Sequence, residues 1–258
     1  MSYYCDRYPI IEKKTLSRDT YSITILAPEA AKAAHTGQFA NIAAPGFTLR
    51  RPISICEFSR SKGTIRFVFE VRGKGTEAIS RLNPGDNLDV LGPLGNGFKI
   101  PDSARKVVLV GGGIGVPPLL GIAKKLGDRA TAILGFRDYS RIILADEFEK
   151  YGANTAICTD DSSVGYNGMV TSPLESTLKN SGADLVCACG PMPMLNAVAR
   201  VCADNNVPCK VSMEQRMGCG VGACVVCSCL TVRNGQEHYA RVCKDGPVFD
   251  AKEVKFNG

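Results

Sequence analysis

Apolar and polar positions alternate along the first hundred residues, as they do in short β-strands with one buried face. The segments DTYSITILAP (19–28) and GTIRFVFEVRG (63–73) follow this period of two, and NPGD (83–86) is typical of a turn. Closely spaced strands without convincing helical periodicity predict a small antiparallel β-barrel. We expect this barrel to occupy residues 1–101, which end just after the glycine-rich segment LGPLGNGF (91–98).

The pattern changes near residue 105, where continuous apolar runs alternate with helical segments. The predicted strands are RKVVLVGGG (105–113), RATAILGFRD (129–138), NTAICTDD (154–161) and ADLVCACGP (183–191). The predicted helices are VPPLLGIAKKL (116–126), SPLESTLKN (172–180) and PMLNAVARVCADNN (193–206). This alternation predicts a doubly wound parallel sheet over residues 102–210. The cysteine- and glycine-rich remainder, 211–258, predicts a third, small domain.

Composition and charge narrow the possible functions of the chain. Its 258 residues carry a net charge of +6 and contain no run of five like charges, so neither a nucleic-acid nor a membrane-surface partner is indicated. The N-terminal sequence MSYYCDRYPI lacks the pattern of a secretion signal, and the longest apolar stretches are too short and glycine-rich to span a bilayer. We therefore expect a cytoplasmic protein whose twelve cysteines are metal ligands or buried small residues rather than disulfides.

The segment MGCGVGACVVCSC (217–229) concentrates four cysteines and admits three interpretations: a disulfide staple, a zinc knuckle or an iron–sulfur loop. Cys219, Cys224 and Cys227 have the spacing C-x4-C-x2-C, and fifteen residues separate Cys227 from the next cysteine, Cys243. This is the spacing of plant-type [2Fe–2S] proteins, whereas zinc ribbons usually carry two C-x2-C pairs. The pattern therefore favours a [2Fe–2S] cluster with these four ligands.

The other cysteines are predicted to be structural. Cys229 is surplus to the cluster pattern, and we expect it to be a small buried residue. Most of the rest lie in apolar strand or helix segments, and we expect the following to be buried: Cys5, Cys56, Cys158, Cys187, Cys202 and Cys209.

Three further segments are candidates for binding phosphate groups. LVGGGIGVPP (109–118) lies between a strand and a helix, although the third glycine of the G-x-G-x-x-G pattern is replaced by Val116. LRRPISI (49–55) places two arginines before a strand, and VRGKGTEAIS (71–80) opens a helix with a glycine loop. Taken singly, each segment is also compatible with a plain turn or a solvated arginine.

Together these motifs resemble the electron-transfer subunits of class 1B dihydroorotate dehydrogenase, within the wider ferredoxin–NADP reductase family. The resemblance rests on RPIS, GKGT, LGPLGNGF, GGGIGVPPLL, CGPMPML, the cysteine loop and RVCKDGPVF, which extend from residue 51 to 249. It implies that residues 1–101 form an FAD-binding barrel, 102–210 an NAD-binding α/β domain and 211–258 a [2Fe–2S] domain.

The resemblance also implies roles for individual residues. Arg51 would face the FAD pyrophosphate, and Ser54 the edge of the isoalloxazine ring. The implied FAD-binding residues are Arg51, Pro52, Ile53, Ser54, Val68, Phe69, Glu70, Gly75 and Thr76. The implied nicotinamide-dinucleotide residues are Gly111, Gly112, Gly113, Gly115, Cys189, Gly190 and Pro191. The implied cluster ligands are Cys219, Cys224, Cys227 and Cys243.

The implied activity is a redox relay in pyrimidine biosynthesis. A separate FMN-containing catalytic subunit would oxidise dihydroorotate to orotate, and its electrons would pass through the cluster and FAD to NAD+, in a heterotetramer of two copies of each subunit. No catalytic acid, base or nucleophile is expected in this chain, and His35 and His238 are expected at the surface. Alternatives are the small subunit of an NADH-dependent ferredoxin:NADP oxidoreductase, a sulfide dehydrogenase subunit, or a non-enzymatic zinc-binding protein.

Overall fold

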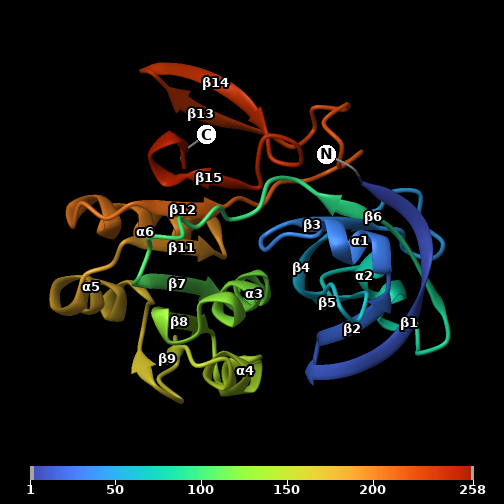
Figure 1. The fold of residues 1–258 in the computed structure, drawn as a ribbon, viewed down its shortest axis with the longest axis horizontal. Helices are drawn as coiled ribbons and strands as arrows, with labels where there is room; N and C mark the ends of the chain where they lie inside the picture. The colour runs from blue at the N-terminus through green and yellow to red at the C-terminus, as the bar shows by residue number, and fades with distance from the viewer. Residues whose placement is uncertain (1–2, 257–258) are drawn as a thin grey trace.

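The N-terminal part of the chain closes into a six-stranded antiparallel β-barrel (Figure 1). The computed structural model describes residues 3–256. The strands lie in the order β1-β2-β5-β4-β3-β6, which confirms the barrel predicted from the alternating pattern. Their bounds are β1 Tyr4–Ser17, β2 Thr20–Leu26, β3 Phe39–Ile42, β4 Arg51–Ser59, β5 Thr64–Glu70 and β6 Asn87–Leu94.

Two short helices accompany the barrel strands. The predicted glycine loop at 71–80 does open a helix, α2 Lys74–Ser80. The other helix, α1 Pro28–Ala33, was not predicted, since its six residues are too few to show helical periodicity.

The two faces of the barrel strands have different partners. Inward-facing Ile23, Ile25 and Phe67 are completely buried in the barrel core. Outward-facing Cys56 on β4 and Val68 on β5 instead pack into the hydrophobic core of the following domain. The barrel is therefore joined to its neighbour through the outer face of β4 and β5.

The second domain is a seven-stranded sheet in the order β10-β9-β8-β7-β11-β12-β15. The strands are parallel apart from β15, which pairs antiparallel with β12 at one edge. Their bounds are β7 Val107–Gly112, β8 Ala130–Phe136, β9 Asn154–Thr159, β10 Tyr166–Asn167, β11 Leu185–Cys189, β12 Cys209–Ser212 and β15 Val248–Asp250.

Helices cover both faces of this sheet, as the doubly wound prediction requires. In Figure 1, α3 Pro117–Leu126 and α4 Ala145–Lys150 lie on the face toward the barrel. The opposite face is covered by α5 Thr171–Ser181 and α6 Met192–Asp204.

The C-terminal region combines a hairpin with a return to the sheet. Strands β13 Ser228–Arg233 and β14 Gln236–Arg241 form a two-stranded sheet above the larger one, and β15 follows (Figure 1). The predicted limit at 210/211 falls within β12, and β15 adds a strand to the sheet from beyond that limit. The domain limits stay predictions. Between residues 3 and 256, no helix has both the length and the apolar character needed to cross a membrane.

Candidate cofactor sites

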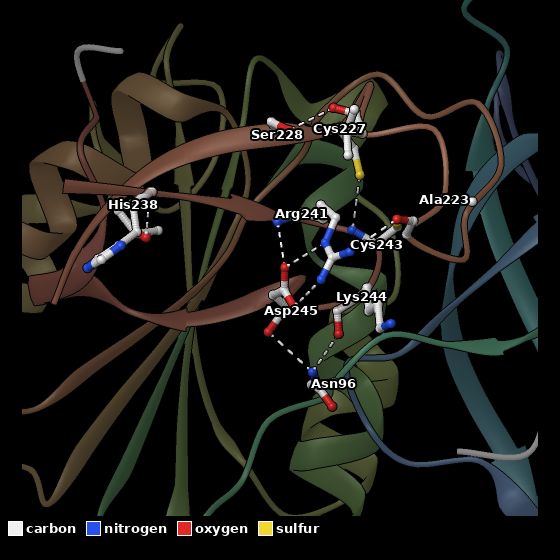
Figure 2. Close-up of polar contacts among 12 residues, drawn as sticks. Asn96, Ala223, Cys227, Ser228, His238, Arg241, Cys243, Lys244 and Asp245 are labelled. Carbon is white, nitrogen blue, oxygen red and sulfur yellow. Dashed lines mark hydrogen bonds and ion pairs between the residues drawn. The ribbon is translucent and has the colours of Figure 1, made fainter.

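The four cysteines of the C-x4-C-x2-C…C pattern come together as two pairs. Cys219 lies beside Cys224, and the backbone N–H of Cys219 donates to the Cys224 Sγ at 3.4 Å. Cys227 lies beside Cys243, whose backbone N–H donates to the Cys227 Sγ at 3.4 Å (Figure 2). The second pair is buried, with each residue 2% exposed, whereas Cys224 is exposed.

The loop backbone is arranged to stabilise thiolates. Cys219 Sγ accepts hydrogen bonds from the N–H groups of Val221, Ala223 and Cys224 at 3.3–3.4 Å. Partial burial opposes ionisation of Cys219, but these N–H donors and the Cys224 thiol outweigh it and lower the pKa of Cys219 to about 6. Thiolate ligands of a metal cluster are stabilised by the same kind of amide donor.

The pairing of the thiols distinguishes between the metal sites considered from the sequence. Among residues 3–256, no group of three or more Cys, His, Asp and Glu side chains surrounds a single metal position. A zinc knuckle needs four ligands around one ion, whereas a [2Fe–2S] cluster needs two thiolates at each of two irons. Two pairs of thiols therefore fit a two-iron cluster, with one pair for each iron.

Two glycines allow the cysteine loop to lie close to its neighbours. Gly220 and Gly222 have φ angles of +75° and +85°, which glycine adopts without strain. A Cβ on Gly220 would lie 2.8 Å from Nδ2 of Asn41, a buried residue on β3 of the barrel. A Cβ on Gly222 would lie 2.6 Å from Cδ of Lys244, next to Cys243. The loop is thus in contact with both the barrel and the segment that carries the fourth thiol.

The phosphate-binding candidates on the barrel also come together. The Arg51 guanidinium lies directly against Gly75 at the start of α2, and its Cζ is 5.3 Å from the centre of the Phe47 ring. Arg51 donates to the backbone carbonyls of Leu49 and Arg50, and within the described part of the chain it has no carboxylate partner. Arg50, by contrast, pairs with Asp89 at 2.7 Å. An uncompensated guanidinium beside a glycine turn fits an anionic phosphate group.

The other predicted FAD-binding residues divide by the direction of their side chains. Ile53 and Phe69 belong to the barrel core, so only their backbones are available to a ligand on the outer surface.

Glu70 forms ion pairs with Arg72 at 2.8 Å and with Arg141 of the second domain at 3.0 Å. Thr76 Oγ1 accepts from the Arg72 N–H and donates to the Gly73 carbonyl, which holds the glycine loop closed. Pro52 is exposed, Ser54 is half-buried, and Val68 packs toward the second domain.

The predicted nicotinamide-dinucleotide residues also meet, between two adjacent strands of the sheet. β7 and β11 are neighbours, with Gly111 opposite Cys189, and the chain continues from them toward opposite edges of the sheet. Such a switch point is where open α/β sheets bind ligands.

Gly115 lies so close to the carbonyl of Cys189 that a Cβ has no room there, and a Cβ on Gly112 would lie 3.1 Å from the ring of Pro191. Gly113 and Gly190 complete the two turns, and burial raises the pKa of the Cys189 thiol to about 12, which keeps it neutral at pH 7.

An ion-pair network that the sequence did not reveal fixes the second domain against the barrel. Arg66 on β5 makes two hydrogen bonds to the carboxylate of Glu147 on α4, at 2.6 and 3.0 Å. Glu57 on β4 pairs with Lys124 on α3 and accepts a hydrogen bond from Tyr151 at 2.9 Å. These partners are 67–94 residues apart in sequence, so no local pattern could have indicated them.

Most predictions for the remaining cysteines and the histidines are confirmed. Cys56, Cys158, Cys187, Cys202 and Cys209 are buried, as is Cys229. His35 and His238 are exposed. The prediction for Cys5 was wrong: it is exposed, on the first strand of the barrel, and its Sγ lies 3.8 Å from Nη2 of Arg50.

Comparisons with known proteins agree with this arrangement. The family profile described as the oxidoreductase FAD-binding domain matches residues 7–98. The profile described as the iron–sulfur cluster binding domain of dihydroorotate dehydrogenase B matches residues 214–255.

Full-length relatives extend the match to nearly the whole chain. The dihydroorotate dehydrogenase B (NAD(+)) electron transfer subunit of Geobacillus kaustophilus is 40% identical, and that of Bacillus caldolyticus 39%, each over 96% of this chain and 98% of the relative. A solved structure of an NADH-dependent reduced ferredoxin–NADP oxidoreductase is 32% identical, with a TM-score of 0.87 over 98% of this chain and 91% of that one. The chain therefore belongs to the family of dihydroorotate dehydrogenase B electron transfer subunits.

Proposed function

We propose that this chain carries electrons from the FMN of a dihydroorotate-oxidising catalytic subunit through a [2Fe–2S] cluster and FAD to NAD+. Bound FAD supplies the exchange between single electrons and a hydride, and the protein holds the cofactors in position. The chain belongs to a family whose relatives are named as electron transfer subunits of dihydroorotate dehydrogenase B, and this membership supports the proposal.

The observation that carries the proposal is the order of the three candidate sites across the barrel wall. Strands β3, β4 and β5 are consecutive neighbours in the barrel. The cysteine loop contacts β3 at Asn41, and the 3-10 turn Gly113–Gly115 lies against β5. The strand β4, which begins with Arg51, lies between them. A flavin on the outer face of β4 would therefore lie between the cluster and the nicotinamide, as a relay requires.

Each group of residues has a part in this relay. Arg51, with Gly75 and Thr76, would bind the FAD pyrophosphate, while Ser54 would face the isoalloxazine edge. Gly111–Gly115 and Cys189–Pro191 would bind the nicotinamide dinucleotide at the switch point of the sheet. Cys219, Cys224, Cys227 and Cys243 would hold the cluster. This chain would need no side chain that transfers a proton, because dihydroorotate would be oxidised in the catalytic subunit.

The proposed partner contact is at the cysteine loop. Next to the exposed Cys224, Val225 and Val226 are 59% and 58% exposed, so the loop presents apolar side chains beside a ligand of the cluster. Exposed apolar groups of this kind mark interaction sites when they cluster. The assembly we propose contains two copies of each subunit. Twelve cysteines that form no disulfide bonds also support a reducing compartment, the cytoplasm.

Reconstitution with the catalytic subunit tests the proposed function directly. The chain alone, with FAD and cluster bound, should oxidise NADH with artificial electron acceptors and should not turn over dihydroorotate. Addition of the FMN-containing subunit should produce NAD+-dependent oxidation of dihydroorotate. Dihydroorotate:NAD+ activity in the chain alone would contradict the proposal, as would a complex whose activity survives complete loss of the cluster.

The similarity to the ferredoxin–NADP oxidoreductase structure supports a second candidate, electron exchange between NADH and a partner that serves ferredoxin and NADPH. The same reconstitution separates the two. If the chain completes NADH-dependent ferredoxin:NADP+ exchange with such a partner, and fails with the dihydroorotate-oxidising subunit, the second candidate replaces the first.

A further inference from the structure

Arg241 lies at the end of β14, two residues before Cys243, and forms an ion pair with Asp245 (Figure 2). Arg241 Nε donates to Asp245 Oδ2 at 3.0 Å, and Nη2 donates to Oδ1 at 3.3 Å. The backbone N–H of Arg241 also donates to Oδ2, at 2.8 Å, and the Asp245 N–H donates to the Arg241 carbonyl. Cys243 is therefore the centre of a five-residue turn that is closed by both backbone and side chains.

The same guanidinium reaches the loop that carries the other thiol pair. Arg241 Nη1 donates to the carbonyl of Gly222 at 3.2 Å, and Gly222 lies between Cys219 and Cys224. One side chain thus connects the loop of the first thiol pair with the turn that contains Cys243. A planar guanidinium suits this task because its donors point in several fixed directions.

A residue of the barrel domain holds the far side of this turn. The Asn96 side-chain amide donates to the carbonyls of Lys244 and Asp245, at 2.9 and 3.2 Å (Figure 2). Asn96 lies two residues after the end of β6. The turn carrying Cys243 is therefore fixed to both the cysteine loop and the barrel.

The ion pair also places two opposite charges beside the thiols. Arg241 and Asp245 side chains are each 33% exposed, so their charges are partly shielded from solvent. Arg241 lies two residues before Cys243 and its guanidinium contacts the loop that carries Cys219 and Cys224, so the ion pair lies close to both pairs of thiols. Charges and hydrogen bonds around a cluster are among the factors that determine its reduction potential.

We propose that Arg241 and Asp245 are positioning residues that hold the two thiol pairs at their working separation and, through their opposite charges, adjust the reduction potential of the cluster. This inference rests on the proposed [2Fe–2S] site. A cation near the cluster stabilises its reduced, more negative state, and an anion destabilises it. Loss of Arg241 alone and loss of Asp245 alone therefore have opposite effects on the potential.

The test uses the full chain with FAD and cluster, in four variants: R241Q, R241K, D245N and R233Q. Arg233 is the matched control, because it lies at the far end of the same hairpin and pairs with Glu253, away from the cysteines. The midpoint potential of the cluster is measured by EPR-monitored redox titration at low ionic strength, and iron content is followed during exposure to a chelator.

We expect R241Q to lower the midpoint potential, D245N to raise it and R233Q to leave it unchanged. R241K keeps the charge but has fewer donor directions, so its potential should lie nearer that of the wild type while its iron is lost faster. The potential shifts should shrink at about 1 M salt, where charges are screened within about 3 Å.

The inference fails if R241Q and D245N move the potential in the same direction, or if neither differs from R233Q. Should R241Q be unable to hold a cluster, D245N and R241K still decide the question, and an unchanged potential in D245N would overturn the proposal. A wild-type chain that binds no two-iron cluster is a different result, since it would contradict the proposed function itself.

Discussion

The guanidinium of Arg51 occupies the space that a side chain on Gly75 would need. A Cβ placed on Gly75 would collide with three atoms of that guanidinium. The two residues lie on different elements, the start of β4 and the first turn of α2. Their contact explains why a glycine lies in the first turn of this helix, although alanine is the better helix former. The absence of a side chain leaves Arg51 free to hold a phosphate group at the helix start.

We expect Gly75→Ala to weaken FAD binding although it improves helix propensity. The added methyl group displaces Arg51, and the loss of one charge-assisted hydrogen bond costs about 1.5–3 kcal/mol, or roughly 10- to 150-fold in affinity. Arg51→Ala should cause a loss in the same range. Fluorescence titration of the deflavinated protein with FAD measures both.

Gly73→Ala is the matched control for that experiment. Gly73 precedes α2, has an extended backbone, and has nothing within 4 Å of an added Cβ. Because the methyl group acts through Arg51, the double variant Arg51→Ala/Gly75→Ala should bind FAD no worse than Arg51→Ala alone. Equal FAD affinity in the Gly75 and Gly73 variants would refute the proposed role of Arg51.

Local patterns in the sequence were sufficient to predict the main elements of the fold. Alternation at period two predicted β2 and β5, and continuous apolar runs predicted β7, β8, β9 and β11. Helices of ten or more residues were also predicted, whereas α1 and α4 have only six residues each and show no recognisable periodicity. Edge strand β15 has three residues and pairs with β12 only after the chain has passed through the hairpin, so its position depends on tertiary packing.

Features that depend on distant partners were not predictable from the sequence. The Arg66–Glu147 contact joins residues 81 positions apart, and Asn96 contacts a turn almost 150 positions away. Cys5 lies in a strand whose side chains are mostly exposed, and the charged Asp6 and Arg7 that follow it were the local signal against its burial. The cysteine spacing, by contrast, is a pattern typical of [2Fe–2S] proteins, and so the four cysteines that come together could be named from the sequence.

Replacement of any of the four paired cysteines by serine should abolish or cripple cluster assembly. Each thiol belongs to a pair, and loss of one would leave one iron of the proposed cluster with a single thiolate. Cys229→Ser is the control, since Cys229 is buried on β13, where burial raises its pKa. Iron analysis should find about two irons per chain in that variant, as a [2Fe–2S] cluster requires. Full iron content in Cys243→Ser would show that the ligand assignment is wrong.

Gly115→Ala should impair the reaction with NADH while leaving FAD and iron in place. The added Cβ would overlap the carbonyl of Cys189 and lie 2.6 Å from the Gly190 N, so the two turns proposed to bind the dinucleotide must separate. We expect kcat/KM for NADH to fall about tenfold or more, equivalent to about 1.4 kcal/mol. Stopped-flow reduction of FAD by NADH measures the effect, and Gly73→Ala again provides the control. An unchanged rate would place the nicotinamide elsewhere.

The side chain of Val225 is exposed and its backbone is strained. One substitution should therefore change both the binding of the catalytic subunit and the free energy of unfolding. Its φ angle is +53°, a region that β-branched residues rarely adopt and that costs about 1–3 kcal/mol. Asparagine tolerates this region, so Val225→Asn should keep the cluster and raise the free energy of unfolding by about 1 kcal/mol. The same change removes an apolar side chain from the proposed docking surface and should weaken binding to the catalytic subunit up to about tenfold.

Val226→Asn separates these two effects. Val226 is equally exposed, but it is not among the described residues with positive φ, so its replacement should weaken partner binding without any gain in stability. Thermal unfolding measures the first quantity, and calorimetric titration with the catalytic subunit measures the second. If both variants bind the subunit as tightly as the wild type, the valines lie outside the contact, and the electron must enter this chain from another side of the cluster.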